Sequence, residues 1–115
     1  LKMPKEDVRI VEIGGGTGIM SLLALHFGYC NTIYSDTFAD SCNDFQKIST
    51  AMGLHPHDIV CGSIEEVGSK HGHPIHLIIS RFGCWIFRCW STMRKVVVGM
   101  QCTILLQARC QKMLS

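Results

Sequence analysis

The sequence lacks the long hydrophobic runs of membrane-spanning and exported proteins. A transmembrane helix needs roughly 20 consecutive apolar residues, and no uninterrupted run approaches that length. The segment from Leu1 to Asp7 also lacks the apolar core of a signal peptide. These absences predict a cytoplasmic protein that does not enter a membrane.

The cysteines show no pairing pattern. Their number is odd, no Cys-x-x-Cys occurs, and several lie within apolar runs. A disulfide framework or a zinc site would need short paired spacings. In a reducing compartment, cysteine packs as a small hydrophobic residue. We therefore expect free, buried thiols at positions 30, 42, 61, 84, 89, 102 and 110.

Charged residues are also scarce, and this excludes some partners. Only 17% of the residues are charged, 47% are hydrophobic, and the net charge is +2. Such a mild positive balance does not favour binding to nucleic acid. At 115 residues the chain predicts one domain, 1–115. Because it begins with Leu1 instead of methionine, we expect a fragment of a longer protein.

What the sequence does contain is a glycine cluster followed at a distance by an acid. Residues 11–18 read Val-Glu-Ile-Gly-Gly-Gly-Thr-Gly, and Asp36 follows the next apolar run. Backbone without side chains can turn sharply and approach a ligand closely. A helix start offers amide groups, and a carboxylate one strand away can bind ribose hydroxyls. The two features together predict a nucleotide pocket, although glycine-rich turns also occur where no ligand binds.

The glycine spacing separates two kinds of cofactor. Nicotinamide and flavin folds use Gly-x-Gly-x-x-Gly, whose third glycine would fall at Ile19. The spacing Glu12-x-Gly14-x-Gly16-x-Gly18 instead resembles motif I of the class I S-adenosylmethionine-dependent methyltransferases. The resemblance extends from about Val8 to about Ala108 and is strongest in the first forty residues.

The resemblance implies both a fold and a set of cofactor residues. The fold would be α/β, a Rossmann-like three-layer sandwich with a mostly parallel sheet of order 3-2-1-4-5, lacking the family's terminal hairpin. The motif I acid would help to fix the loop and the methionine amino group, the glycines would wrap the methionine and ribose, and the acid at position 36 would bond the ribose. The cofactor residues so implied are Glu12, Gly14, Gly15, Gly16, Gly18, Asp36, Thr37, Ser63, Ile64 and Ser80.

One of these positions departs from the family pattern. After strand three, relatives often carry an acid that accepts a hydrogen bond from the adenine amino group, and here Ser63 stands in its place. A hydroxyl can still bond, but more weakly than a charged group. Ile64 would flank the ring and offer its backbone amide. Glu65 or Glu66 could substitute for the missing acid, or be solvated helix residues, and we favour the second interpretation.

Hydrophobic periodicity places these residues on alternating strands and helices. A helix from Ser41, with Asp44 three residues on, would show an apolar stripe of Cys42, Phe45, Ile48 and Met52 and end at Gly53. The other helices expected are Ile19 to Phe27, ended by Gly28, and 84–98. The strands expected are Val8 to Ile13, Thr32 to Ser35, Asp58 to Cys61, His76 to Ser80 and, as an exposed apolar edge, Thr103 to Gln107.

The segment after strand four bears on the methyl acceptor. The signature Asn/Asp-Pro-Pro-Tyr/Phe of amino-group methyltransferases is absent from Ser80-Arg81-Phe82-Gly83. This favours O-methylation of a small molecule, and the region faintly resembles sugar O-methyltransferases. A hydroxyl acceptor needs a base, usually histidine, but no histidine is close to the glycine loop in the sequence. The catalytic residues therefore stay unknown, and the fragment itself could be inactive.

Two further patterns have ordinary explanations. His71-x-His73-x-x-His76 could suggest a metal site, but Gly72 and Pro74 indicate a turn, so we expect no metal. Basic residues alternate with aromatic ones between Arg81 and Lys95. This pattern could form a face for nucleic acid or a membrane surface, but we favour an amphipathic helix packed on the sheet with its basic side in water. Two rival functions remain: a dinucleotide-binding oxidoreductase, and a non-catalytic remnant that serves as an interaction module.

Overall fold

The computed structural model describes residues 3–72, 74–80 and 83–86. Within that part of the chain, strands and α-helices alternate from β1 to β4 after a short 3-10 helix, η1, and a further strand follows β4 directly. The elements in chain order are η1 (Lys5–Asp7), β1 (Ile10–Glu12), α1 (Ile19–His26), β2 (Thr32–Asp36), α2 (Ala39–Met52), β3 (Asp58–Cys61), α3 (Ile64–His71), β4 (Leu77–Ser80) and β5 (Gly83–Ile86).

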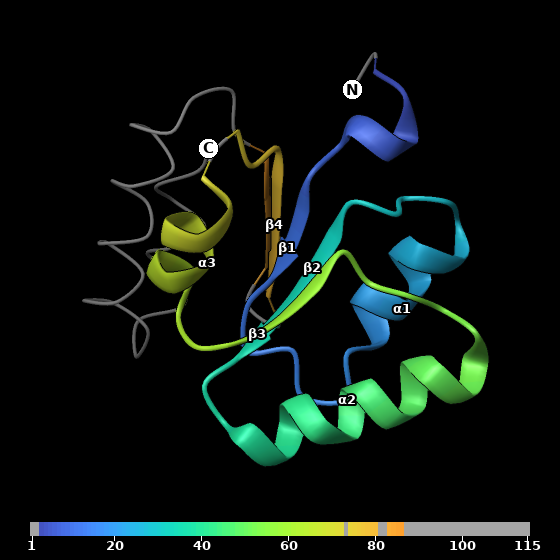
Figure 1. Cartoon of the computed structure of the whole chain (residues 1–115). Coiled ribbons are helices and arrows are strands. Elements are labelled where there is room, and N and C mark those ends of the chain that lie inside the picture. Colours follow the sequence, from blue (N-terminus) through green and yellow to red (C-terminus); the bar gives the residue numbers. More distant parts are fainter. Residues whose placement is uncertain (1–2, 73, 81–82, 87–115) are drawn as a thin grey trace.

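One sheet organises the structure, in the order β3-β2-β1-β4-β5 (Figure 1). The first four strands are parallel, as expected of a doubly wound α/β fold. Val11 pairs with Ile33 on one side and Ile78 on the other, and all three side chains are fully buried. Near-continuous apolar residues are typical of strands that are covered on both faces.

The edge next to β4 differs from the sequence expectation. The neighbour of β4 is β5, which is antiparallel and pairs Ser80 with Gly83 and Leu77 with Ile86. The expected helix over 84–98 is therefore wrong at its start, because residues 84–86 form this strand. The rest of that helix and the expected strand Thr103 to Gln107 lie outside the described residues.

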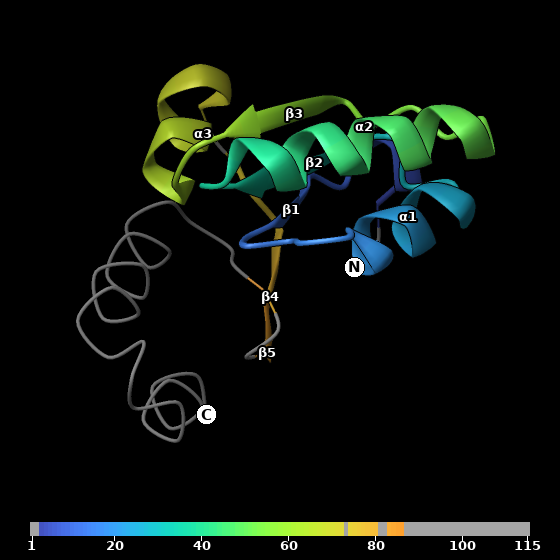
Figure 2. The same cartoon turned by 90° about the horizontal axis from the view of Figure 1, so that it is seen from below.

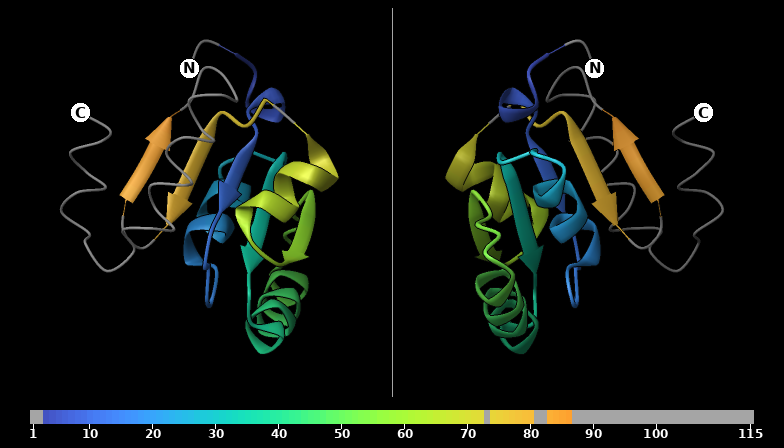
Figure 3. Two further views of the ribbon diagram at one scale, coloured as in Figure 1. Left: turned by 90° about the vertical axis from the view of Figure 1, so that its left-hand side faces the viewer. Right: turned by 90° about the vertical axis from the view of Figure 1, so that its right-hand side faces the viewer.

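Helices cover both faces of the sheet. In the two opposed views of Figure 3, α1 and α2 lie on one face and α3 on the other. Seen from below in Figure 2, α1 and α2 run along the side of β1, β2 and β3. One core cluster lies under these two helices and contains Leu22, Leu25, Tyr34, Cys42 and Phe45.

The helix boundaries show which local signals were reliable. Gly53 ends α2 in a left-handed conformation, as predicted, whereas the predicted start at Ser41 is wrong because α2 begins at Ala39. The Asp36 carboxylate accepts a hydrogen bond from the N–H of Phe38, the N-cap residue, and so turns the chain into the helix earlier. Met52 is 58% exposed, so it does not belong to the buried stripe. Sequence periodicity had not delimited α3.

Candidate functional site

The glycine loop connects the carboxyl end of β1 to α1, at the lower end of the sheet in Figure 1. Gly16 has φ +58°, a backbone conformation that side chains disfavour, and a Cβ at this position would meet nothing within 4 Å. Gly18 is the N-cap of α1, and its Cβ would lie 2.1 Å from the Phe45 ring. The loop therefore packs closely on the core at Gly15 and Gly18 and has open space in front of Gly14 and Gly16.

Two side chains of β2 hold the peptide groups of Gly16. The Gly16 N–H donates to Oδ2 of Asp36 at 3.0 Å, and the Tyr34 hydroxyl donates to the Gly16 carbonyl at 2.5 Å. Oδ1 of Asp36 accepts the N–H of Phe38 at 2.9 Å. Asp36 is only 6% exposed. The structure thus brings together the glycine loop and the acid that the sequence had placed in one site.

The carboxylate of Glu12, the last residue of β1, is hydrogen-bonded to the start of α1. Its Oε1 accepts two hydrogen bonds from Ser21 in the first turn of α1, from the N–H at 3.1 Å and from the hydroxyl at 2.5 Å. Burial raises the pKa of the Glu12 carboxyl, and the nearby charge of Asp36 adds to this, although the Ser21 hydrogen bonds oppose it. Glu12 therefore joins the end of β1 to the start of α1.

The glycine loop and the two strands beside it are acidic, with Glu12 and Asp36 as their charged side chains in the described part of the chain. No lysine or arginine occurs between Arg9 and Lys47. Burial raises the pKa of the Tyr34 phenol, and so do several acidic neighbours, including Asp36, Glu12 and Asp44. A carboxylate near a hydrogen-bonded helix start favours cations over anions. This end of the sheet is therefore suited to a neutral or positively charged ligand.

The remaining predicted residues lie along the same carboxyl edge of the sheet. Thr37 is exposed after Asp36, whereas Ser63 is half-buried as the N-cap residue of α3. Ile64 as a whole is only 5% exposed and belongs to the core. Ser80 is half-buried at the end of β4. The strands thus gather these positions at one edge, with Thr37 the most open of them.

Glu66 lies closer to this edge than the sequence indicated. A Cβ on Gly62 would lie 1.8 Å from Oε2 of Glu66, so the carboxylate lies against the residue that follows β3. Glu65 and Glu66 are both exposed in the first turn of α3. Glu66 therefore provides a carboxylate beside Gly62, at the end of β3.

Sequence reasoning missed three residues of the site. Ser21 bonds Glu12, Tyr34 bonds the loop, and Phe38 is a 72% exposed aromatic side chain adjoining Asp36. Phe38 could have been found from the sequence. It is an aromatic residue two positions after Asp36, the acid that ends the strand, and so it lies at the same edge of the sheet. Ser21 and Tyr34 carried no signal, because their roles depend on the packing of α1 on β2.

The loop and its surroundings offer three kinds of group to a ligand. The open space at Gly16 accepts close approach of a ligand, and each oxygen of the Asp36 carboxylate keeps a second lone pair beyond the bond it already accepts. Phe38 offers an exposed ring close by. This arrangement supplies backbone, carboxylate and aromatic surface, which are the groups that bind a ribose and its base.

The described histidines lie at the opposite end of the sheet. His57 and His71 have ring centroids 5.4 Å apart, and His71 contacts Asp58 at the start of β3 at 2.7 Å. His76 Nδ1 accepts the N–H of Arg9 just before β4. Over the described residues, no group of three or more His, Cys, Asp or Glu could hold a metal ion. His73 lies outside them.

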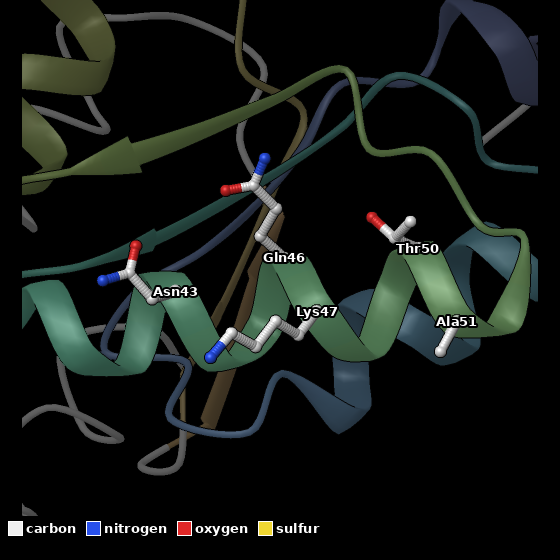
Figure 4. A pocket seen from close by; sticks show the side chains of 5 residues that line it. All are labelled: Asn43, Gln46, Lys47, Thr50 and Ala51. Atoms are coloured by element: carbon white, nitrogen blue, oxygen red, sulfur yellow. The ribbon is translucent and has the colours of Figure 1, made fainter.

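Two hollows lie away from the loop. One follows the outer surface of α2 and is lined by polar side chains of that helix, with Ala51 at one end (Figure 4). The other is an apolar groove of about 350 Å³ between α1, β1 and β4, lined by residues that include Met20, Leu23, Phe27 and Ile79. Neither is lined by a residue of the glycine loop or by Asp36.

The described helices are all too short or too polar to cross a membrane. No protein-family model, curated protein or solved structure matches the chain.

Proposed function

We propose that the chain is the cofactor-binding domain of a class I S-adenosylmethionine-dependent methyltransferase with a Rossmann-like fold. The enzyme would be cytoplasmic and would transfer the methyl group to a small molecule, by O-methylation. The proposal rests on the motif I resemblance together with the meeting of Gly16 and Asp36 across the ends of β1 and β2.

The observation that carries the proposal is the charge of the site. Two carboxylates, Glu12 and Asp36, flank the loop, and no basic residue accompanies them between Arg9 and Lys47. The sulfonium of S-adenosylmethionine is a cation, whereas the pyrophosphate of a dinucleotide is an anion that binds at a free helix N-terminus. Here the Ser21 N–H in the first turn of α1 is already bonded by Glu12. The loop therefore favours the sulfonium nucleoside.

Different residues would contact different parts of the ligand. The backbone at Gly14, Gly16 and Gly18 would wrap the methionine and ribose, and Asp36 would accept the ribose hydroxyls. The ligand supplies an electrophilic methyl group, and the protein orients it for in-line attack, because positioning provides much of the rate. Adenine would lie against Phe38 and Thr37, near Ser63 and the Ile64 backbone, and Ser80 would face the acceptor side.

A non-catalytic interaction module is the second candidate. The described histidines that could act as a base lie at the amino ends of the strands, opposite the loop. Ser63 also replaces the acid that relatives direct to adenine. A dinucleotide-binding oxidoreductase is disfavoured by Ile19, which occupies the position of the third glycine at the first residue of α1.

Calorimetric titration with S-adenosylhomocysteine and with NAD⁺ tests the proposal. We expect the first to bind and the second not to, because the pyrophosphate of NAD⁺ would place two negative charges beside Glu12 and Asp36, whereas S-adenosylhomocysteine carries no phosphate and its carboxylate is balanced by its ammonium group. Tighter binding of NAD⁺ would favour the oxidoreductase. Binding of neither ligand by the folded chain would favour the interaction module.

A variant pair then locates the binding site. Gly16→Val should abolish binding of S-adenosylhomocysteine, because it fills the open space at the loop. Gly53→Val is the matched control: its φ is +70° and its Cβ position is also open, but it lies at the far end of α2. The control should bind normally while carrying a similar backbone strain. Equal binding by both variants would place the ligand elsewhere.

A further inference from the structure

Two cysteines meet at the carboxyl edge of the sheet, beside Asp36. Cys42, in the first turns of α2, directs its Sγ to the carbonyl oxygen of Asp36 at 3.5 Å. Cys61, the last residue of β3, is the register partner of Asp36 in the parallel pair β2–β3. Asp36 therefore has one thiol above it on the helix and another beside it on the strand.

The sheet geometry directs both thiols to the same side. Successive residues of a strand point to opposite faces, so Tyr34 and Asp36 share a face, and so do their partners Ile59 and Cys61. Tyr34 and Ile59 pack in the cluster under α2 that also contains Cys42. Cys61 therefore projects toward the helix that carries Cys42.

The two thiols differ in access to solvent. Cys61 is exposed, whereas Cys42 is 6% exposed. Burial raises the pKa of the Cys42 thiol to about 11, and its interaction with the Cys61 thiol contributes to this. Cys42 is therefore protonated at neutral pH and shielded from reagents, whereas Cys61 can be reached by an oxidant.

We propose that Cys42 and Cys61 form a redox-active pair that closes to an intramolecular disulfide when the protein meets a hydroperoxide. The Cys61 thiol loses its proton and the thiolate attacks one peroxide oxygen. The O–O bond breaks, Cys61 becomes a sulfenic acid, and the departing hydroxide or alkoxide takes up that proton and leaves as water or an alcohol. The Cys42 sulfur then attacks the Cys61 sulfur, the S–O bond breaks, and hydroxide leaves with the Cys42 proton as water. Two thiols are oxidised and one peroxide is reduced.

The disulfide would alter the edge where the glycine loop lies. It would join the start of α2 to the end of β3 and remove the thiol hydrogen that Cys42 directs to the Asp36 carbonyl. Neither the pair nor its chemistry depends on which nucleoside binds at the loop. The inference therefore stands independently of the proposed methyl transfer.

Peptide mapping after oxidation tests the pair. Trypsin cuts after Lys47 and Lys70, so Cys42 and Cys61 fall on separate peptides, 10–47 and 48–70. The background variant Cys30→Ser leaves Cys42 as the sole cysteine of its peptide. After hydrogen peroxide and alkylation of free thiols, we expect these two peptides joined, with the loss of two hydrogen atoms. The joined species should be absent from the additional variant Cys61→Ser.

The Cys42–Cys61 link should form faster in the folded protein than in the unfolded one. The same link should form several-fold more slowly in urea, where the β2–β3 pairing is lost. Oxidation of Cys61 to sulfinic acid with Cys42 still open to alkylation after unfolding would overturn the proposal. So would a link that forms as readily in urea as in buffer. Because Cys61 is exposed, its replacement by serine should leave the fold intact, which circular dichroism can verify.

Discussion

Tyr34 and Phe45 stack face to face beneath the glycine loop, with ring centroids 4.0 Å apart and ring planes 4° from parallel. Both side chains are fully buried. A Cβ added to Gly18 would come within 2.1 Å of Phe45 and 3.1 Å of Tyr34. The loop after β1 therefore leaves no room for a side chain at position 18, and the ring pair couples the loop to α2.

Gly18→Ala should consequently destabilise the fold by about 2–3 kcal/mol, because it combines overpacking with a positive φ. Gly53→Ala is the matched control, since its φ is similar but its Cβ would meet nothing within 4 Å. We expect it to cost about 1 kcal/mol, from the backbone conformation alone. Urea unfolding of both variants measures the difference. Equal losses would show that the contact with Phe45 is not limiting.

Asp36→Ala should weaken binding of S-adenosylhomocysteine by about 1.5–3 kcal/mol, the range for hydrogen bonds to a charged group. The reason is that Asp36 both positions Gly16 and offers its carboxylate to the ribose. Calorimetric titration at a temperature where the variant is folded gives the affinity. Asp40→Ala, an exposed acid in the first turn of α2, should bind as the wild type does. Unchanged binding by Asp36→Ala would refute the assignment of the pocket.

The sequence predicted the elements whose signals are local. Gly53 ends α2, and Asp58–Cys61 is a strand with the predicted bounds, because turn residues and β-branched runs act through neighbouring backbone. The loop and Asp36 also lie side by side as expected, since parallel strands bring their carboxyl ends to one edge, whereas their role in binding a cofactor stays a prediction.

The remaining features depend on contacts between distant residues. Residues 84–86 form β5 because β4 offers a pairing edge, which outweighs their helical spacing. The expectation of buried thiols holds for Cys42 but is wrong for Cys30 and Cys61, which are exposed. Among the other cysteines, 89, 102 and 110 lie outside the described residues. Whether a cysteine is buried depends on which helix covers it in the fold, and the spacing of the cysteines in the sequence does not show this.

Glu12→Gln should change how stability depends on pH. The pKa of Glu12 in the folded state is raised above its ordinary value of 4.5. The stability that protonated Glu12 contributes is therefore fully present below pH 4.5, and it is lost as the pH rises through the folded-state pKa. Glutamine can still accept the Ser21 hydrogen bonds without carrying a charge. The free energy of unfolding should therefore fall less in the variant than in the wild type between pH 4 and 7.

Urea titrations across that pH range provide the measurement for Glu12→Gln. Glu65→Gln is the control, because Glu65 is exposed on α3. Its profile should follow the wild type. A Glu12→Gln profile parallel to the wild type would mean that burial does not disfavour the charge of Glu12.

Asp58 should show the opposite pH dependence. Burial alone would raise its pKa, but hydrogen bonds from Lys70 and His71, both 2.7 Å from Oδ2, and from the Ile59 N–H together hold the pKa below its ordinary value of 3.8. The stability that it contributes is therefore full above that value and is lost as the pH falls through the folded pKa. Because Lys70 is 58% exposed, solvent screens much of its attraction.

Asp58→Asn should thus cost about 1 kcal/mol at pH 7, and the difference from wild type should vanish in acid. Asp7→Asn, at an exposed position in η1, should change little at either pH. Urea unfolding at pH 7 and near pH 2.5 distinguishes the two variants. If Asp58→Asn lost the same stability at both pH values, the cause would be packing at the start of β3. The ion pair that joins β3 to the end of α3 would then have no measurable role.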